Sequence, residues 1–309
     1  MHPFTKIPAD SVSALGEDKL IAAIRRWLGR ASPRAPFGIG DDCAVLPASR
    51  APQLLTIDPV IYGEHFDDRV PPRAAGEKLF KRNLSDIAAM GGRPRAAVVA
   101  LALDRHVKLA WLEQFYRGLA AVSRRHHVPL VGGDIAHHRG GIVATLTLVG
   151  EAAAARTVTR TGARIGDSIW VTGALGHSLR SGHHWKFSPR LAEGQWLARQ
   201  RGVRSMIDVS DGLAKDLRAL APRGAVAALD PAAIPRRAGA TLAAALSDGE
   251  DYELVFALAA RADRGKFARA WRRKFPRTPL ACLGRFVRAG ALPAGALNLA
   301  DYRGFEHLR

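Results

Sequence analysis

The chain has 309 residues, of which 48% are hydrophobic, and a formal net charge of +18. This length is enough for two ordinary domains, and the composition is that of a globular protein. Its longest apolar stretches, such as 96–103, are far shorter than the roughly 18 to 20 residues needed to cross a bilayer, so we expect a cytoplasmic protein without a membrane segment. The only two cysteines, Cys43 and Cys282, exclude a disulfide framework and a four-thiolate metal site.

The positive charge is greater in the second half of the chain. Residues 1–150 have a net charge of +6, and residues 151–309 have +12. The densest basic run, 261–277, carries Phe267, Trp271 and Phe275 at a helical spacing. We therefore expect a helix that packs on a sheet and keeps its basic side in water. A nucleic-acid partner is the alternative explanation of the charge, and it is the less favoured one.

Strand-like and helix-like segments alternate along the chain, which predicts an α/β or α+β architecture. After a short strand beginning at Cys43, the first half is predicted to contain strands at 54–62, 96–103, 128–133 and 142–150 and helices at 75–90 and 108–125. The alternation restarts near Thr161, with strands predicted within 168–176, 205–209, 225–230 and 251–259. We place the domain boundary near 150, giving an N-terminal domain at 1–150 and a C-terminal domain at 151–309.

Aspartates recur where these strands end or helices begin, beside glycine or apolar residues. They are Asp41, Asp42, Asp58, Asp86, Asp134, Asp208 and Asp211. Each alone is compatible with a turn or a helix cap. Together they indicate a site for Mg²⁺, which prefers carboxylate oxygens completed by water and substrate phosphates. The sequence has no P-loop and no protein-kinase motifs, so a nucleotide would be held through metal ions and helix N-termini.

Several long motifs occur in a characteristic order. They are GIGDDCAVL (38–46), TIDPVIYGEHF (56–66), KLFKRNLSDIAAMGGRP (78–94), GGD (132–134), VTRTGARIGDSIWVTGALGHS (158–178), HHWKFSPRLAEGQWL (183–197), MIDVSDGLAKDL (206–217), GEDYELVF (249–256) and GFEHL (304–308). On these residues the chain resembles the thiamine-monophosphate kinases, a branch of the superfamily that includes aminoimidazole ribonucleotide synthetase and selenophosphate synthetase. The resemblance implies a two-domain α/β (α+β) fold with an N-terminal ATP- and Mg²⁺-binding sheet domain that forms a homodimer interface.

The resemblance also implies a reaction and a set of site residues. The reaction is transfer of the γ-phosphoryl group of ATP to thiamine monophosphate with the help of several Mg²⁺ ions, and Asp58, Asp86 and Asp211 are the implied catalytic residues. The implied metal ligands are Asp42, Thr56, Asp58, Asp86, Asp134, Asp208 and Asp211, with Asp41 as an alternative to Asp42. ATP contacts are implied for Gly133, Asp134, Arg160 and Ser210, and thiamine monophosphate contacts for His65, Glu250 and Phe305.

The sequence departs from the family pattern in four places. Only one hydroxyl residue, Thr56, precedes Asp58, the loop after GGD lacks threonines, Asp248 adds a charge, and few residues separate Ser178 from His183. The alternatives are therefore a relative with another small phosphorylated acceptor and an inactive relative that binds RNA or another anion. The histidine pairs at 126–127, 137–138 and 183–184 lack a zinc-site context, and we interpret them as surface or loop residues.

Overall fold

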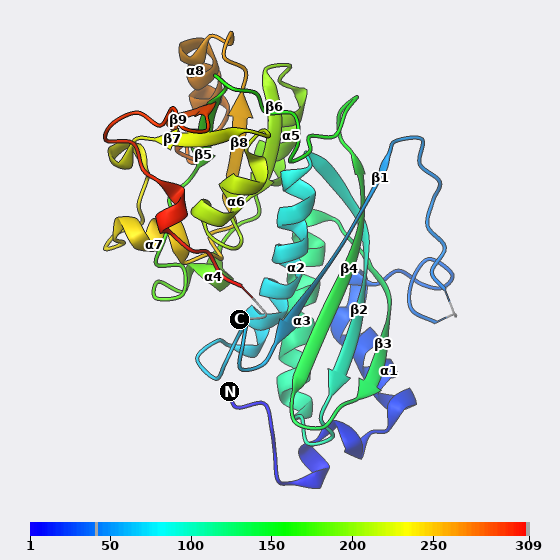
Figure 1. Cartoon of the computed structure of the whole chain (residues 1–309). Coiled ribbons are helices and arrows are strands. Elements are labelled where there is room, and N and C mark those ends of the chain that lie inside the picture. The colour runs from blue at the N-terminus through cyan, green and yellow to red at the C-terminus, as the bar shows by residue number, and fades with distance from the viewer. Residues whose placement is uncertain (41–42, 307–309) are drawn as a thin grey trace. The chain divides into compact units, whose positions relative to one another are not determined.

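The computed structural model describes residues 1–40 and 43–306 and divides into two compact units. Unit 1 comprises Met1–Leu84 and Pro94–Glu151, and unit 2 comprises Ser85–Arg93 and Ala152–Arg309 (Figure 1). The architecture is mixed α/β, as predicted, with one sheet in each unit. Among the described residues, no helix combines the length and the hydrophobicity that crossing a membrane requires.

Unit 1 is built on a four-stranded sheet in the order β1-β4-β2-β3. Its strands are β1 (Gln53–Ile61), β2 (Gly92–Leu103), β3 (Leu130–His137) and β4 (Ile142–Ala152). β1 pairs antiparallel with β4, and β2 pairs parallel with β3. The four predicted strands 54–62, 96–103, 128–133 and 142–150 are confirmed. The strand expected after Cys43 is wrong, because the chain has no regular structure there and Cys43 is exposed.

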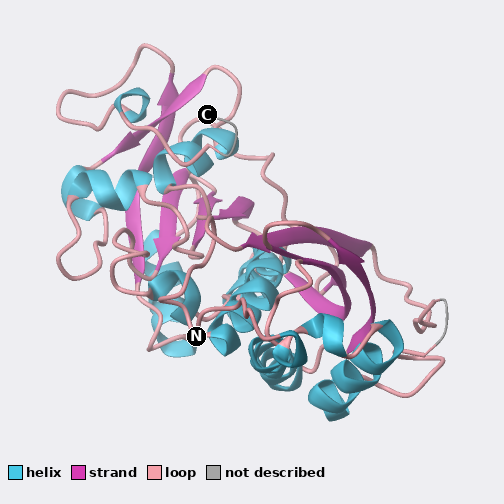
Figure 2. Cartoon of the chain, turned by 90° about the horizontal axis from the view of Figure 1, so that it is seen from below, coloured by secondary structure: helices cyan, strands magenta, loops and turns pink. Residues whose placement is uncertain are grey.

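The helices of unit 1 are α1 (Glu17–Leu28), α2 (Pro72–Ala89), whose residues from Ser85 belong to unit 2, and α3 (Leu109–His126). Figure 2 shows helices gathered on one face of the curved sheet. Helices α2 and α3 approach closely because each has a glycine at the contact. A Cβ on Gly76 of α2 would lie 2.1 Å from Phe115 O, and a Cβ on Gly118 of α3 would lie 2.0 Å from Arg73 O. A stacked row of rings, Phe66, Trp111 and Phe115, completes this core.

Unit 2 is built on a five-stranded sheet in the order β6-β8-β5-β9-β7, in which all four pairings are antiparallel. The strands are β5 (Ser168–Thr172), β6 (Val203–Asp208), β7 (Ala225–Leu229), β8 (Leu254–Leu258) and β9 (Leu280–Arg288). The helices are α4 (His183–Lys186), α5 (Leu191–Arg199), α6 (Leu213–Leu220), α7 (Leu242–Ser247) and α8 (Arg264–Lys274).

The basic run at 261–277 forms helix α8, as predicted. Phe267 and Trp271 are buried, and Phe267 packs on Trp170 of β5 and Phe256 of β8. The arginines and lysines of this helix are exposed on its other side. The spacing of the aromatic residues therefore correctly predicted a helix that packs on a sheet.

Candidate functional site

The inward face of β1 carries two of the predicted metal ligands of unit 1. Thr56 and Asp58 alternate with Leu55 and Ile57, so they point to the opposite face of the strand. The Asp58 carboxylate lies 3.5 Å from the Arg82 guanidinium of α2, which also donates to Pro59 O at 2.8 Å. Both side chains are largely buried, so Arg82 offsets the charge of Asp58. Sequence reasoning did not single out Arg82.

His65 lies in the turn after β1 and is half-buried. Its ring nitrogen Nδ1 accepts a hydrogen bond from Ile61 N at 3.2 Å, which fixes the plane of the imidazole. The buried ammonium of Lys78 donates to His65 O at 2.6 Å. A predicted substrate residue is thus held at both its ring and its backbone.

Gly133 and Asp134 on β3 line a cavity of 480 Å³ in unit 1. Its other walls come mainly from apolar side chains of α1 and the sheet, including Ile24, Leu28 and Val99. A Cβ on Gly133 would lie 2.1 Å from Val99 O, so strand packing by itself requires glycine at this position. Asp134 is exposed.

Asp208 ends strand β6 in unit 2 and is 3% exposed. Its Oδ2 atom accepts a hydrogen bond from the hydroxyl of Ser85 at 2.6 Å. Ser85 immediately precedes Asp86 on α2, so the structure brings the predicted ligands Asp86 and Asp208 into one neighbourhood of unit 2. Thr159 O accepts from Met206 N, which also places the neighbour of Arg160 beside β6.

The turn between β6 and α6 is held by a carboxylate that sequence reasoning missed. Asp216 Oδ2 accepts hydrogen bonds from Ser210 N and Asp211 N, both at 3.0 Å. Asp216 is 5% exposed, and burial raises its pKa to about 7. The sequence contained a signal, since Asp216 lies on the same helical stripe as Leu213, Leu217 and Leu220.

The C-terminal tail lies against this turn. Phe305 N donates to Asp211 O at 2.8 Å, and Lys215 Nζ lies 2.6 Å from both the Asp211 carboxylate and Phe305 O. The structure therefore joins a predicted metal ligand, Asp211, to a predicted substrate residue, Phe305, through Lys215. The Phe305 residue is 50% exposed.

Glu250 lies beside the same turn and has an unusual backbone. Its N–H donates to Ser210 O at 2.7 Å, and both Glu250 and Tyr252 have positive φ, 52° and 51°. A left-handed conformation is costly for residues with a side chain and persists where the surroundings impose it. Two such residues in one short segment mark it as a specialised loop.

The interpretation of His184 as a surface residue is wrong. His184 is 7% exposed, and its Nδ1 atom lies 3.5 Å from Glu250 Oε2. The one-turn helix α4 turns this side chain inward, while its neighbour His183 contacts Asp251 O at 2.9 Å. Phe187 stacks on Tyr252 with ring centroids 4.0 Å apart. The segment after the shortened loop therefore forms one wall around Glu250.

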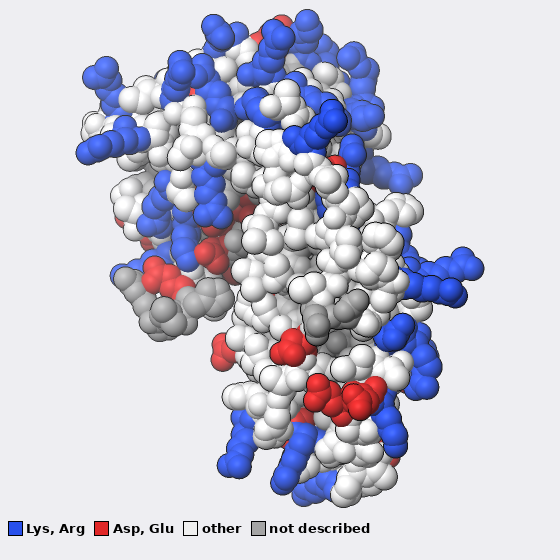
Figure 3. Space-filling model, turned by 90° about the vertical axis from the view of Figure 1, so that its right-hand side faces the viewer, with Lys and Arg blue, Asp and Glu red and all other residues white. Residues whose placement is uncertain are grey.

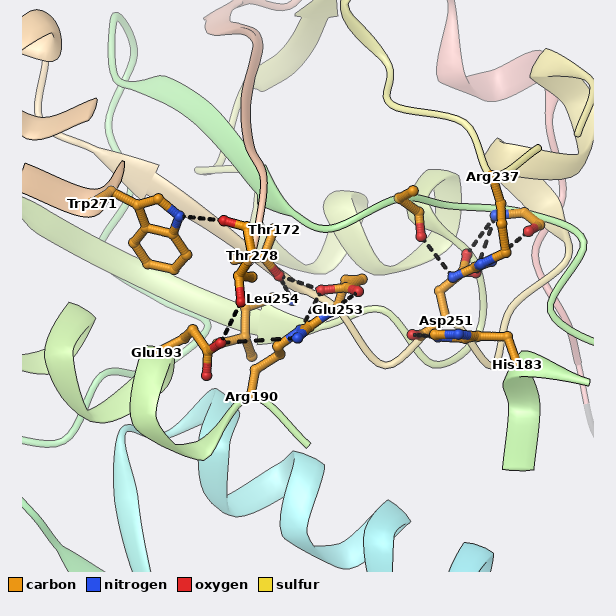
Figure 4. Close-up of polar contacts among 12 residues, drawn as sticks. Thr172, His183, Arg190, Glu193, Arg237, Asp251, Glu253, Leu254, Trp271 and Thr278 are labelled. Atoms are coloured by element: carbon orange, nitrogen blue, oxygen red, sulfur yellow. Dashed lines mark hydrogen bonds and ion pairs between the residues drawn. The ribbon is translucent and has the colours of Figure 1, made fainter. Parts of the chain in front are cut away.

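Two buried acids anchor the loop that carries Glu250, and Figure 4 shows the contacts of both. Asp251 accepts from Gly176 N at 3.0 Å and from Arg237 at 2.7 Å. Glu253 accepts two hydrogen bonds from Arg190, at 2.7 and 2.6 Å, and one from Thr172 at 2.6 Å. Such paired bonds fix direction as well as distance. Alternate residues of the loop are thus tied to the body of unit 2.

A pH dependence follows from Asp251. Burial is the main cause that raises its pKa to about 6, and Arg237 opposes it. The folded state then binds the proton more tightly than the unfolded state, so this stabilisation is complete below about pH 4 and is lost as the pH rises through about 6. We expect the free energy of unfolding of wild type, measured by urea unfolding, to fall by on the order of 2 to 3 kcal/mol relative to that of Asp251→Asn as the pH is raised from 4 to 6.5. A stability difference that is constant with pH would contradict this assignment.

The predicted metal ligands fit Mg²⁺ in donor chemistry but not as a complete cage. Within residues 1–40 and 43–306, no three carboxylate, imidazole or thiolate groups converge to hold an ion. Asp41 and Asp42 lie outside the described residues. Mg²⁺ commonly takes one or two carboxylates and completes its shell with water and phosphate oxygens. Asp86 and Asp208 in unit 2, and Thr56 and Asp58 in unit 1, supply hard-oxygen donors of this kind.

Comparison with known proteins identifies the family. Residues 40–152 match the family described as AIR synthase related protein, N-terminal domain. A thiamine-monophosphate kinase from Rhodopirellula baltica is 36% identical over 77% of this chain and 80% of the relative. Another, from Salmonella typhimurium, is 33% identical over 95% of this chain and 98% of the relative. The chain belongs to the thiamine-monophosphate kinase family.

Solved structures agree with this family membership. The crystal structure of thiamine-monophosphate kinase from Stenotrophomonas maltophilia K279a superposes with a TM-score of 0.73 at 30% identity, covering 89% of this chain and 95% of that one. The structure described as AaThiL complexed with AMPPCP and TMP has a TM-score of 0.69 at 27% identity and covers 96% and 98% of the two chains. The two-unit architecture is thus that of the thiamine-monophosphate kinase family.

Proposed function

We propose that this chain transfers the γ-phosphoryl group of ATP to thiamine monophosphate, forming thiamine diphosphate and ADP. The observation that carries the proposal is the similarity, over 96% of the chain, to AaThiL complexed with AMPPCP and TMP. The chemistry is consistent with it. A phosphate monoester has a second pKa near ~6, so the acceptor is mostly dianionic at neutral pH and needs no general base. The protein's task is then to align two anions and offset their repulsion.

The residues of each unit have distinct proposed roles. In unit 2, Asp86, Asp208 and Asp211 hold Mg²⁺, and Ser210, Lys215 and Arg160 face the phosphates; in unit 1, Thr56, Asp58 and Asp134 are the corresponding oxygen donors. Bound Mg²⁺ would neutralise charge on the phosphates that meet in the reaction. Asp216 keeps the Ser210–Asp211 turn in place through its two N–H contacts. The apolar cavity beside Gly133 and Asp134 suits the base of ATP.

Contacts with thiamine monophosphate are proposed separately for His65 in unit 1 and for Glu250 and Phe305 in unit 2. Phe305 offers an exposed ring to the thiazolium cation of thiamine. Glu250 offers a carboxylate that contacts His184 through Oε2 and accepts from the Tyr252 hydroxyl through Oε1. His184 is therefore a positioning residue in this proposal.

Replacing His184 by asparagine is expected to raise KM for thiamine monophosphate about 5- to 10-fold and to change kcat less than about threefold. The reason is that Glu250 loses one of its side-chain partners, 3.5 Å from Oε2, and keeps the Tyr252 hydroxyl at Oε1. Steady-state kinetics at saturating ATP measure both constants. His127→Asn is the matched control, because His127 is exposed and asparagine tolerates its left-handed backbone. A loss of kcat with unchanged KM would contradict the positioning role.

A homodimer is proposed through the outer face of the unit 1 sheet. Leu55 and Ile57 on β1 are 73% and 63% exposed, and Val98 on β2 adds to the same apolar face. Exposed apolar area of this kind favours an interface.

Leu55→Arg with Ile57→Arg is expected to convert a dimer of the 33.3 kDa chain into a monomer in sedimentation velocity experiments. Two charges in a desolvated interface are costly to bury without partners. Leu179→Arg is the control, because Leu179 is 62% exposed but belongs to unit 2. A wild-type monomer, or a variant that remains dimeric, would refute this interface.

Product chromatography tests the activity. Wild type incubated with ATP, Mg²⁺ and thiamine monophosphate should form thiamine diphosphate, and the reaction without Mg²⁺ should not. If ATP is consumed only with a different phosphorylated acceptor, the sister-activity alternative replaces the proposal. RNA binding without ATP turnover would support the inactive relative instead.

A further inference from the structure

Five arginines line one cavity of 650 Å³ in unit 2. They come from three separate segments: the chain before β5, the stretch from the α5–β6 turn into the start of β6, and the chain just after β8. They are Arg156, Arg164, Arg201, Arg204 and Arg261. No Asp or Glu is present among the described residues that line the cavity. Lys and Arg also crowd the top of the face shown in Figure 3.

A buried carboxylate beneath the cavity holds these segments together. Asp167 is 1% exposed and accepts hydrogen bonds from Arg164 N at 2.8 Å and Ala260 N at 3.0 Å. Its Oδ2 also forms an ion pair with Arg204 Nε at 3.2 Å. Asp167 thus contacts the backbone of Arg164, the side chain of Arg204 and the backbone of the residue before Arg261. Asp167 carries one negative charge and the cavity has five arginines, so the carboxylate organises the cavity but leaves most of its positive charge.

Arg156 is also fixed in place. Its guanidinium donates to Gln200 O at 3.1 Å and to Val203 O at 2.6 Å, across the turn between α5 and β6. Arg201 and Arg261 are exposed beside this framework. The arrangement combines the fixed guanidinium groups of Arg156 and Arg204 with two exposed ones that can reach a ligand.

The cavity lies at the opposite end of β6 from Asp208, a proposed metal ligand of unit 2, while Arg160, a proposed ATP contact, lies between Arg156 and Arg164 in sequence and does not line the cavity. β6 runs from Val203 to Asp208, with the arginine cavity at its first end and Asp208 at its last. Arg204 and Asp208 are four positions apart on the strand, which corresponds to about 13 Å. The neighbouring strand β8 runs antiparallel to β6, with Leu258 paired to Val203 and Leu254 paired to Asp208. The last residue of β8 is therefore at the cavity end of the sheet, and its first residue is at the Asp208 end.

We propose that this arginine cavity binds a compact oligophosphate anion. Guanidinium groups pair with phosphate oxygens through two parallel hydrogen bonds, and several of them can share a chain of phosphates. The cavity has the volume of a small-molecule site. Its remaining described lining is glycine, alanine and valine, without an aromatic ring on which a nucleic-acid base could stack. Recognition is therefore by charge, and a short phosphate chain is favoured over RNA.

Titration calorimetry of the full chain with inorganic tripolyphosphate, without Mg²⁺ and at 0.15 M KCl, tests this site. Arg201→Glu with Arg261→Glu is expected to weaken binding at least about 10-fold, and Arg201→Gln with Arg261→Gln less strongly. Arg272→Glu with Arg273→Glu is the matched control, because these exposed residues of α8 change the net charge equally outside the cavity. Binding to this control should stay within about twofold of wild type.

Thiamine monophosphate phosphorylation provides the second measurement. Turnover by Arg201→Glu with Arg261→Glu should equal that of wild type, which separates this cavity from the transfer site and shows that the variant is folded. The proposal is overturned if wild type does not bind tripolyphosphate, or if the cavity and control variants lose affinity equally. It is also overturned if a 12-nucleotide oligouridylate binds more tightly than tripolyphosphate and loses affinity in the same variant, since the cavity would then belong to a nucleic-acid interface.

Discussion

Asp208→Asn is expected to lower kcat/KM for thiamine monophosphate at least about 10³-fold, or about 4 kcal/mol, while the protein stays folded. Asparagine has the same size and its amide oxygen can still accept the hydrogen bond from Ser85. The change therefore removes mainly the negative charge at the end of β6. Steady-state kinetics and thermal unfolding of the same preparation measure the two effects separately.

Asp230→Asn is the matched control for this charge removal. Asp230 is exposed and caps a short 3₁₀ helix by accepting from Ala232 N, a role that asparagine also fills. Its activity should remain within about twofold of wild type. An active Asp208→Asn enzyme would remove Asp208 from the proposed metal ligands, and the role of its neighbour Asp86 would need separate proof.

Glu253→Leu is expected to reduce the free energy of unfolding by about 3 to 5 kcal/mol. Glu253 is 2% exposed, and its loss leaves the Arg190 guanidinium and the Thr172 hydroxyl without their shared acceptor. Equilibrium urea unfolding measures the change. Glu113→Leu breaks an exposed pair with Arg117 and should cost less than about 1 kcal/mol.

The double variant Arg190→Leu with Glu253→Leu distinguishes loss of packing from an unpaired charge. If the unpaired guanidinium is the cause, the double variant should be more stable than Glu253→Leu, because neither charge is then left without a partner. A double variant that is less stable than the single one would mean that Arg190 contributes through packing of its own.

Local patterns predicted most elements well, because each depends on neighbouring residues. The stripe of Phe267 and Trp271 determined α8, and Gly91 marked the end of α2. Strand β9 was not predicted. It contains Gly284, which lies against Ala228 of β7 so closely that a Cβ would be 1.9 Å from Ala228 O. The reason for that glycine lies in a partner strand more than fifty residues away, which alternation along the chain does not reveal.

Some residues of the candidate site could be predicted from sequence motifs, and others could not. Asp208, Asp211 and Glu250 belong to contiguous motifs, and the resemblance could point to them one by one. Arg82, Lys215 and His184 matter through contacts with Asp58, Asp211 and Glu250, which only the folded chain specifies. His184 was misinterpreted for this reason: a pair of histidines carries no periodicity, and the burial of one of them depends on the turn at Gly182 that begins α4.

Helix α2 is divided between the two units. Its residues before Ser85 belong to unit 1, whereas Ser85–Arg93 belong to unit 2, where Gly92 O accepts from Gln195 and Met90 O from Val158 N. A gene segment encoding Ala152–Arg309 alone would lack these partners, and one encoding residues 1–151 would carry a stretch whose contacts lie elsewhere. Neither unit is contiguous in the sequence, so a chain cut between residues 151 and 152 is expected to leave the unit 2 contacts of Ser85–Arg93 without their partners.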